Sequence, residues 1–364
     1  MHIPDGYIGP QTYIPLFVMM ASLWSIALAK LKQTLHIRRV PMLALGAAFC
    51  FVIMMFNVPI PGGTTGHAVG AVLIAILLGP WAACIAVSLA LIVQAFLFGD
   101  GGITAIGANC FNMAVVMPFL GWGVYRTIAG SAPVQSTRHW IGGAVGGYVG
   151  LCAASVLTGF EFGIQPLIAH DAAGRALYAP FSLNIAVPAM ALEHMLVFGF
   201  VEAIVTGLVV SYFQRTAPEM IVPAATTERE RPSWLIPRLA AIMGILALLS
   251  PLGLLLPEKF NAGSAWGEWS SDEIKLEIAK ESGSGQEGYV PKGLSQMEES
   301  GWKAPMPDYA LPGQEEAPLS QLMLSYILAG AIGMTVSGFL IILGVKAFAR
   351  KNDENVPAMR PPHA

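Results

Sequence analysis

Long apolar segments restrict the fold of this chain more than any other feature. Of its 364 residues, 55% are hydrophobic and 12% are charged, and the mean hydropathy is +0.61. Most apolar runs approach the roughly 20 residues that a helix needs to cross a bilayer, and they are too many for one globular core. The sequence therefore predicts an all-α, polytopic membrane helix bundle. The expected spans are residues 12–31, 40–58, 67–79, 81–98, 104–127, 139–160, 184–213, 235–256 and 320–348.

Basic residues predict the orientation of these nine spans, because cytoplasmic loops are enriched in Lys and Arg. Such residues follow the first, seventh and ninth spans and flank the connection between the fifth and the sixth. We therefore expect the N-terminus outside and the C-terminus inside the cell inner membrane. Arg175 departs from this pattern, since the same topology places it on the outer side of the membrane. Only Gly79-Pro80 separates the third and fourth spans, so one of them is expected to be short or tilted.

A change in composition divides the chain after the seventh span. Residues 1–215 are expected to form a metal-binding seven-helix module, 216–234 a cytoplasmic linker, and 235–364 a two-helix module. Between the last two spans lies a hydrophilic segment, residues 257–319, with 12 acidic residues against five lysines and no arginine. Such a composition predicts an external loop that is solvated and partly mobile.

The amino terminus offers nitrogen donors for a metal ion. The amine of Met1, the deprotonated amide nitrogen of His2 and Nδ1 of its imidazole can close a five-membered and then a six-membered ring on one ion. Because His2 is large, we expect Met1 to be retained. Planar all-nitrogen sites favour Cu(II) or Ni(II), whereas Zn(II) has no such preference.

His67 is the candidate for the fourth ligand. It follows the glycine-rich stretch 61–66 and begins the third span, on the side where Met1 is expected. The alternative is that His67 is simply a polar residue at a helix start. Metal binding would displace protons from an amine with a pKa of about 8 and an imidazole near about 6.5, so affinity should fall in acid.

A second glycine-rich stretch, residues 98–104, runs into a helix with polar residues. Asn109 and Asn112, together with Thr64, are candidates to hydrogen-bond the metal ligands and fix an imidazole tautomer. The alternative is that the glycines turn the chain and the asparagines cap the helix.

Ala44 and Ala48 give the second span a small-residue face that lets another helix approach closely. This face is a candidate partner interface. Helix packing within one chain is the alternative, and the four cysteines, all in or beside apolar segments, are also interpreted as packing residues.

Several functions are excluded by what the sequence lacks. It has no GxxxxGK[ST], HExxH or GxSxG motif, so we do not expect an enzyme, and any energy for active transport would have to come from elsewhere. A net charge of -3 gives no indication of a nucleic-acid partner.

The motifs resemble those of the NikM/CbiM family, the substrate-binding components of energy-coupling factor transporters for nickel and cobalt. The resemblance covers about residues 1–215, and the quoted motifs are 1–6, 64–67, 98–104, 106–109 and 159–163. The two-helix tail resembles the small N component of the same systems. Pro4-Asp5 is more similar to the nickel branch than to the cobalt branch.

This resemblance implies an ion held by the amine of Met1, the amide nitrogen and imidazole of His2, and the imidazole of His67. It also implies a six-helix core with the first span as an addition, a transmembrane coupling component that meets Ala44 and Ala48, and two cytoplasmic ATPase subunits. We therefore expect the substrate-capture component of an ATP-driven Ni(II) importer. The alternatives are a cobalt importer of the same kind and, in a different class, a membrane metal sensor or metalloenzyme.

Overall fold

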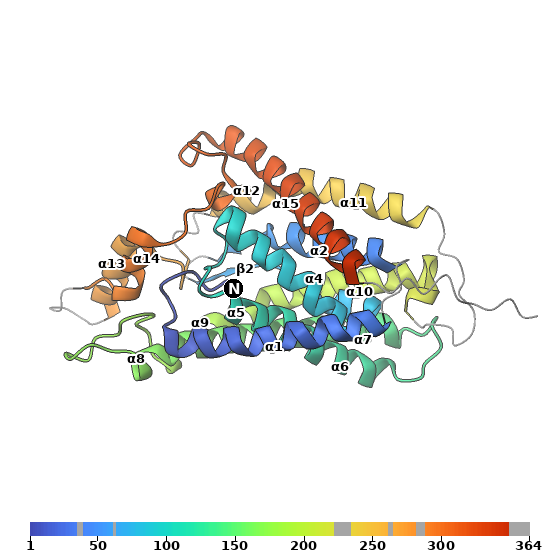
Figure 1. The fold of residues 1–364 in the computed structure, drawn as a ribbon, viewed down its shortest axis with the longest axis horizontal. Helices are drawn as coiled ribbons and strands as arrows, with labels where there is room; N and C mark the ends of the chain where they lie inside the picture. The colour runs from blue at the N-terminus through green and yellow to red at the C-terminus, as the bar shows by residue number, and fades with distance from the viewer. Residues whose placement is uncertain (35–38, 61–62, 222–233, 261–264, 282–287, 349–364) are drawn as a thin grey trace, which may run out of the picture.

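The computed structural model describes residues 1–364 except 35–38, 61–62, 222–233, 261–264, 282–287 and 349–364. It is a bundle of long helices, most of which run along one common direction (Figure 1). Six helical segments in the described part of the chain are long and apolar enough to cross a membrane. They are Pro10–Gln33, Pro80–Phe98, Arg138–Ile168, Leu183–Thr216, Leu235–Lys259 and Leu319–Gly344.

All nine apolar runs are largely helical, which confirms the all-α prediction. In the first part of the chain the helices are α1 (Pro10–Thr34), α2 (Val40–Met54), α3 (Ala71–Leu78), α4 (Pro80–Val93), α5 (Ile106–Cys110), α6 (Met117–Ala129), α7 (Arg138–Gly163), α8 (Gln165–Ile168), α9 (Leu183–Glu193) and α10 (Gly199–Thr216). In the last part they are α11 (Leu235–Leu249), α12 (Leu252–Phe260), α13 (Ser271–Glu281), α14 (Lys292–Ser300) and α15 (Leu319–Phe348).

Shorter elements connect these helices. Three are π-helical turns, a geometry that is frequent at functional sites: η2 (Gln94–Phe98), η3 (Phe111–Val116) and η4 (His194–Phe198). Two are 3₁₀ turns, η5 (Pro218–Met220) and η6 (Pro307–Tyr309). A small antiparallel hairpin pairs β1 (Val58–Pro59) with β2 (Thr65–Gly66), with Val58 opposite Gly66.

The break at Gly79-Pro80 has a clear backbone cause. Gly79 has φ 94°, a conformation that favours glycine, and Pro80 then starts α4. The preceding helix α3 has only eight residues, and nearly all of them are buried. It is far shorter than the roughly 20 residues of a full crossing. The count of nine spans and their orientation stay predictions.

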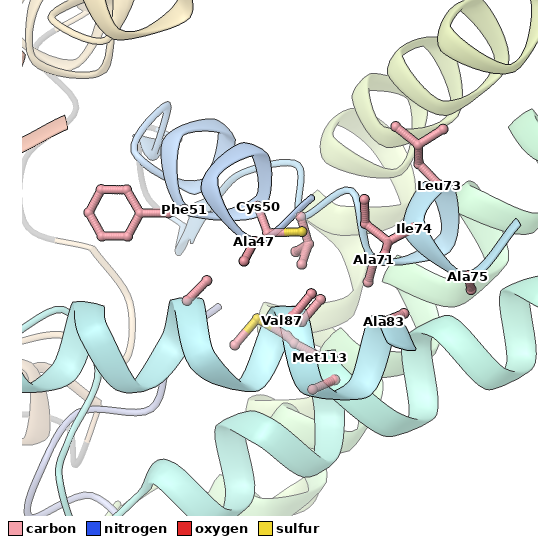
Figure 2. Packing of buried hydrophobic residues seen from close by; sticks show 14 of the residues in the cluster. Ala47, Cys50, Phe51, Ala71, Leu73, Ile74, Ala75, Ala83, Val87 and Met113 are labelled. Carbon is pink, nitrogen blue, oxygen red and sulfur yellow. The ribbon is translucent and has the colours of Figure 1, made fainter. Parts of the chain in front are cut away.

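The core of the first module forms where α2, α3 and α4 meet η3. Figure 2 shows Cys50 of α2, Ile74 of α3, Val87 of α4 and Met113 of η3 converging between these elements, all of them buried. The four cysteines are free and buried, as their interpretation as packing residues requires.

One end of the bundle is covered by α8, α13 and α14, and the first residue of the chain lies near it (Figure 1). We call this the capped end. Part of the cover comes from the hydrophilic segment, residues 257–319, whose described residues include the helices α13 and α14. Trp269, Ile274 and Leu294 from this segment are buried in one apolar cluster with Ile3 and Tyr7 near the amino terminus. These few apolar residues give it a packed face that the many charges obscure in the sequence.

Most of the expected linker lies outside the described residues, because 222–233 are among the gaps. The division at 215 and 235 therefore stays a prediction. The last helix, α15, packs against α2 of the first part.

Candidate metal site

The amino-terminal segment enters the capped end and is held there by the loop after η2. The amine of Met1 donates to the backbone oxygen of Thr65 at 3.1 Å, and the Met1 side chain is 1% exposed. Asn109 accepts from the Ile3 N–H at 2.9 Å and donates to the Ile3 oxygen at 3.1 Å. The carboxylate of Asp5 accepts the backbone N–H groups of residues 103 and 104 at 2.9 and 2.8 Å.

His2 and His67 lie next to each other. Their ring centroids are 4.8 Å apart and their planes are inclined by 44°. Both side chains are buried, and the Nε2 atom of each ring has no hydrogen-bond partner. Nδ1 of His67 faces the backbone oxygen of Ala68 at 3.1 Å. The structure therefore brings together the three predicted ligand residues, Met1, His2 and His67.

The environment of His2 differs in one respect from the expected chelate. Its Nδ1 atom contacts the carboxylate of Asp100. Closing the six-membered ring with the His2 amide would therefore require the imidazole to leave Asp100. In the arrangement described here, the ring nitrogen that keeps a free lone pair is Nε2.

Burial favours the uncharged, ligand form of two of these groups. Loss of solvation lowers the pKa of the Met1 amine, although Glu268, Asp100 and Glu193 oppose this shift. The pKa of His67 is lowered well below its ordinary value. The largest cause is burial, and electrostatic repulsion from His2 and from the amine adds to it. A metal ion competes with protons for such donors, so a lowered pKa favours metal binding near neutral pH.

The three residues expected to support the ligands have different environments. Asn109 binds the backbone of Ile3 and does not contact an imidazole. Asn112 donates to Thr158 at 3.2 Å and to Glu161 at 2.8 Å, on the adjacent helix α7. Thr64 is buried, and its backbone oxygen accepts from Ile60, but the neighbouring Thr65 is the residue that receives the Met1 amine.

Ala44 and Ala48 are both buried in α2. The helix α2 packs against α15 of the same chain. A Cβ atom built on Gly338 of α15 would lie 3.6 Å from the backbone oxygen of Ala44. Ala44 therefore packs against α15 of the same chain, and the partner interface at Ala44 and Ala48 stays a prediction.

Sequence reasoning missed four residues that surround the site: Asp5, Asp100, Glu268 and Tyr309. Asp100 contacts His2, while Thr65 donates its hydroxyl to Glu268. One signal was available, since Asp100 is the only charged residue in the expected loop 98–107. Tyr309 and Glu268 come from a part of the chain that has no local sequence relation to the site.

Another acidic side chain secures the backbone beside His67. The buried Glu202 of α10 accepts the N–H of Val69 at 2.8 Å and that of Gly70 at 3.1 Å. It thereby supplies partners for N–H groups where α3 begins. Within the described part of the chain, no three His, Cys, Asp or Glu side chains form a metal cluster.

The fold and site together define a multi-pass helical membrane protein with a buried group of nitrogen donors at its amino terminus. Comparison with known families identifies it more closely. Residues 2–220 match the CbiM family, described as the cobalt uptake substrate-specific transmembrane region, and residues 237–351 match the PDGLE domain. The chain belongs to the CbiM/NikM family and carries a fused PDGLE domain.

Individual relatives agree with this family. The chain is 44% identical to the fused nickel transport protein NikMN of Rhodobacter capsulatus, covering 96% of this chain and 99% of that protein. It is 43% identical to the probable fused nickel transport protein LarMN of Lactiplantibacillus plantarum, covering 95% and 98%. The chain is also 51% identical to a truncated transition metal transporter of known crystal structure. This match has a TM-score of 0.56 and covers 58% of this chain and 98% of that one.

Proposed function

We propose that this protein is the substrate-capture component of an ATP-driven energy-coupling factor importer for Ni(II). The observation that carries the proposal is the burial of the Met1 amine beside His2 and His67, whose Nε2 atoms have no partner. The names of the two fused relatives, both nickel transport proteins, support the choice of metal.

The donors that the chain offers are the Met1 amine, the amide nitrogen of His2 and the imidazoles of His2 and His67. Four nitrogen donors in a square plane suit Ni(II). The lowered pKa values of the amine and of His67 weaken the competition of protons with the ion for these two groups. Chelation with the His2 amide uses Nδ1, the ring nitrogen that contacts Asp100 in the structure, so the imidazole would exchange Asp100 for the ion when the metal binds.

Transport against a gradient requires energy, and the sequence has no phosphate-binding GxxxxGK[ST] motif. We therefore assign ATP hydrolysis to cytoplasmic ATPase subunits and its transmission to a transmembrane coupling component. Uptake of radioactive nickel by cells should require these subunits together with this chain. Equal uptake by cells that make this chain alone would contradict the assignment.

Cobalt is the second candidate substrate, because the family description refers to cobalt uptake. Competitive titration of purified protein with a native amino terminus against Ni(II), Co(II) and Cu(II) separates these metals. The d-d absorption band reports the coordination geometry, and a planar nickel spectrum is expected.

The first test of the site uses two substitutions. His2→Ala and His67→Ala should each abolish tight Ni(II) binding, because each removes an imidazole that a single ion needs. His170→Ala is the matched control, since His170 is exposed. It should bind as the wild type does. If His2→Ala and His67→Ala retained wild-type affinity, the site assignment would be wrong.

A further inference from the structure

A short piece of the two-helix module lies on the β1–β2 hairpin. We call residues 265–269 the docking segment. The backbone N–H of Trp266 donates to the oxygen of Gly63 at 2.8 Å, and Glu268 accepts the hydroxyl of Thr65. Thr65 is the first residue of strand β2. The docking segment therefore binds the hairpin at two points, on the strand that leads to the third proposed metal ligand.

The hairpin depends on contacts of this kind. Each of its two strands has only two residues, and even a longer two-stranded hairpin is marginally stable on its own. The backbone oxygen of Thr65, which receives the Met1 amine at 3.1 Å, is therefore placed by the segments that surround the hairpin.

The docking segment is itself anchored to the first module. The rings of Trp266 and Trp269 lie 5.6 and 5.3 Å from the ring of Phe181, measured between centroids. The hydroxyl of Tyr7, in the amino-terminal segment, donates to the backbone oxygen of Trp269 at 2.7 Å. Gly267 turns the chain between the two tryptophans with φ 84°, a conformation that favours glycine. The docking segment thus contacts both parts of the chain that supply the proposed ligands.

We propose that Glu268 is a positioning residue of the metal site. By binding the Thr65 hydroxyl it holds strand β2, whose backbone oxygen receives the Met1 amine and which ends one residue before His67. The fused module thereby helps to keep two proposed ligands at a fixed separation. This inference rests on the proposed function, that is, on Met1 and His67 being metal ligands.

The contacts of Glu268 can persist when an ion is bound. Glu268 binds the Thr65 hydroxyl, which is not a proposed donor. An amine that binds an ion through its lone pair keeps two N–H groups, so the Met1 amine can still donate to the oxygen of Thr65. Nε2 of His67 has no hydrogen-bond partner and stays available. Positioning by Glu268 therefore does not compete with coordination.

The negative charge of Glu268 does not oppose the ion either. Of the acidic residues near the Met1 amine, Glu268 has the strongest electrostatic effect on it. A protonated amine with a neutral amide carries one positive charge. Ni(II) on a neutral amine and a deprotonated amide also carries one positive charge, because two protons have left for the solvent. A neutral amine would gain one positive charge on binding, so a carboxylate stabilises the loaded form at least as well as the empty one.

The first test titrates full-length variants with Ni(II). Glu268→Ala should weaken binding by roughly 10-fold and change the d-d band, because the support of two ligands is lost. Glu268→Gln should recover most of this loss, since the amide oxygen can accept the same hydroxyl. Glu299→Ala is the matched control, because Glu299 is an exposed acidic residue of the same module. It should bind as the wild type does.

A double substitution tests whether Glu268 acts through Thr65. Thr65→Val removes the hydroxyl and nearly keeps the shape of the side chain, so it should weaken Ni(II) binding to a similar extent. Adding Glu268→Ala to it should have little further effect, because both changes break the same contact. Thr65→Val also keeps the inference testable if Glu268→Ala does not fold, because wild-type binding by Thr65→Val would overturn it.

Thermal unfolding of the metal-free variants separates positioning from general stability. A merely structural role would lower the unfolding midpoint of Glu268→Ala and leave its affinity and d-d band at wild-type values, which would overturn the inference. So would an equal loss of affinity in Glu299→Ala, no recovery in Glu268→Gln, or full additivity in the double variant. Failure of the proposed function would look different. In that case the wild-type protein itself would not bind Ni(II), or His67→Ala would bind as tightly as the wild type.

Discussion

Single residues of the amino-terminal segment are placed mainly by bonds to its backbone. Asn109 binds both the N–H and the oxygen of Ile3, the residue after His2. The backbone of Gly102 lies so close to the amino-terminal segment that a Cβ atom on Gly102 would be 2.4 Å from the backbone nitrogen of Asp5. Such contacts fix the position of Met1 and His2 without using their own donor atoms. Of the donor atoms themselves, Nε2 of His2 has no hydrogen-bond partner, whereas the Met1 amine donates to Thr65 and Nδ1 of His2 contacts Asp100.

This arrangement predicts different outcomes for the two asparagines. Asn109→Ala should weaken Ni(II) binding by about 10-fold or more, the usual loss when a residue that supports metal ligands is removed. Asn112→Ala should cost about 1–3 kcal/mol of stability, because Glu161 loses a buried hydrogen bond, but it should leave the affinity unchanged. Calorimetric titration and thermal unfolding of both variants provide the measurement. Equal losses of affinity would mean that Asn109 has no special role.

Pairs of helices are brought together by glycines facing larger side chains. On α15, Gly333 faces the ring of Phe51, and Gly330 lies near the sulfur of Met55. A Cβ atom on Gly333 would lie 1.9 Å from the Phe51 ring, whereas one on Gly330 would be 3.4 Å from Met55. The Phe51 ring also contacts Tyr309 at a centroid distance of 6.4 Å. The packing of α2 on α15 therefore borders the segment that carries Tyr309.

Gly333→Ala should destabilise the protein by about 1–3 kcal/mol, because the added methyl group overlaps the buried Phe51 ring. Gly344→Ala, in the same helix, is the control, since nothing lies within 4 Å of the position of its Cβ atom. Thermal unfolding in detergent should show a lower midpoint for Gly333→Ala alone. A similar decrease for both variants would indicate an effect of helix conformation and not of contact with α2.

At the scale of the whole molecule, hydrophobic composition and the length of the apolar runs were enough to predict the helical bundle, because every apolar run has few structural alternatives in a membrane. The proposed ligand residues followed from chemistry that is local to Met1 and His2, with His67 added from a separate glycine-rich loop. Tyr309 could not be found in this way. It lies 209 positions from Asp100 in the sequence, and only the tertiary fold brings the two together.

The hydrophilic segment illustrates the same limit. Its acidic residues dominate the composition, yet Trp269, Ile274 and Leu294 bury their side chains against the amino-terminal segment. Composition averages over residues, whereas docking depends on a few apolar side chains with the right spacing. The contribution of this segment to the site was therefore not visible in the sequence.

The arrangement of the whole molecule predicts that additions to the two ends of the chain will have unequal effects. The Met1 amine is buried and bonded to Thr65, so residues placed before it would remove a donor and have to enter a packed interior. A short Gly-Ser extension before Met1 should abolish tight Ni(II) binding, whereas the same extension after Ala364 should leave it intact. Titration of both proteins with Ni(II), after mass spectrometry has established their amino termini, measures this difference. Tight binding by the amino-terminally extended protein would remove the amine from the donor set. The extension turns this amine into an amide nitrogen, which can bind the ion only after losing its own proton in addition to that of the His2 amide.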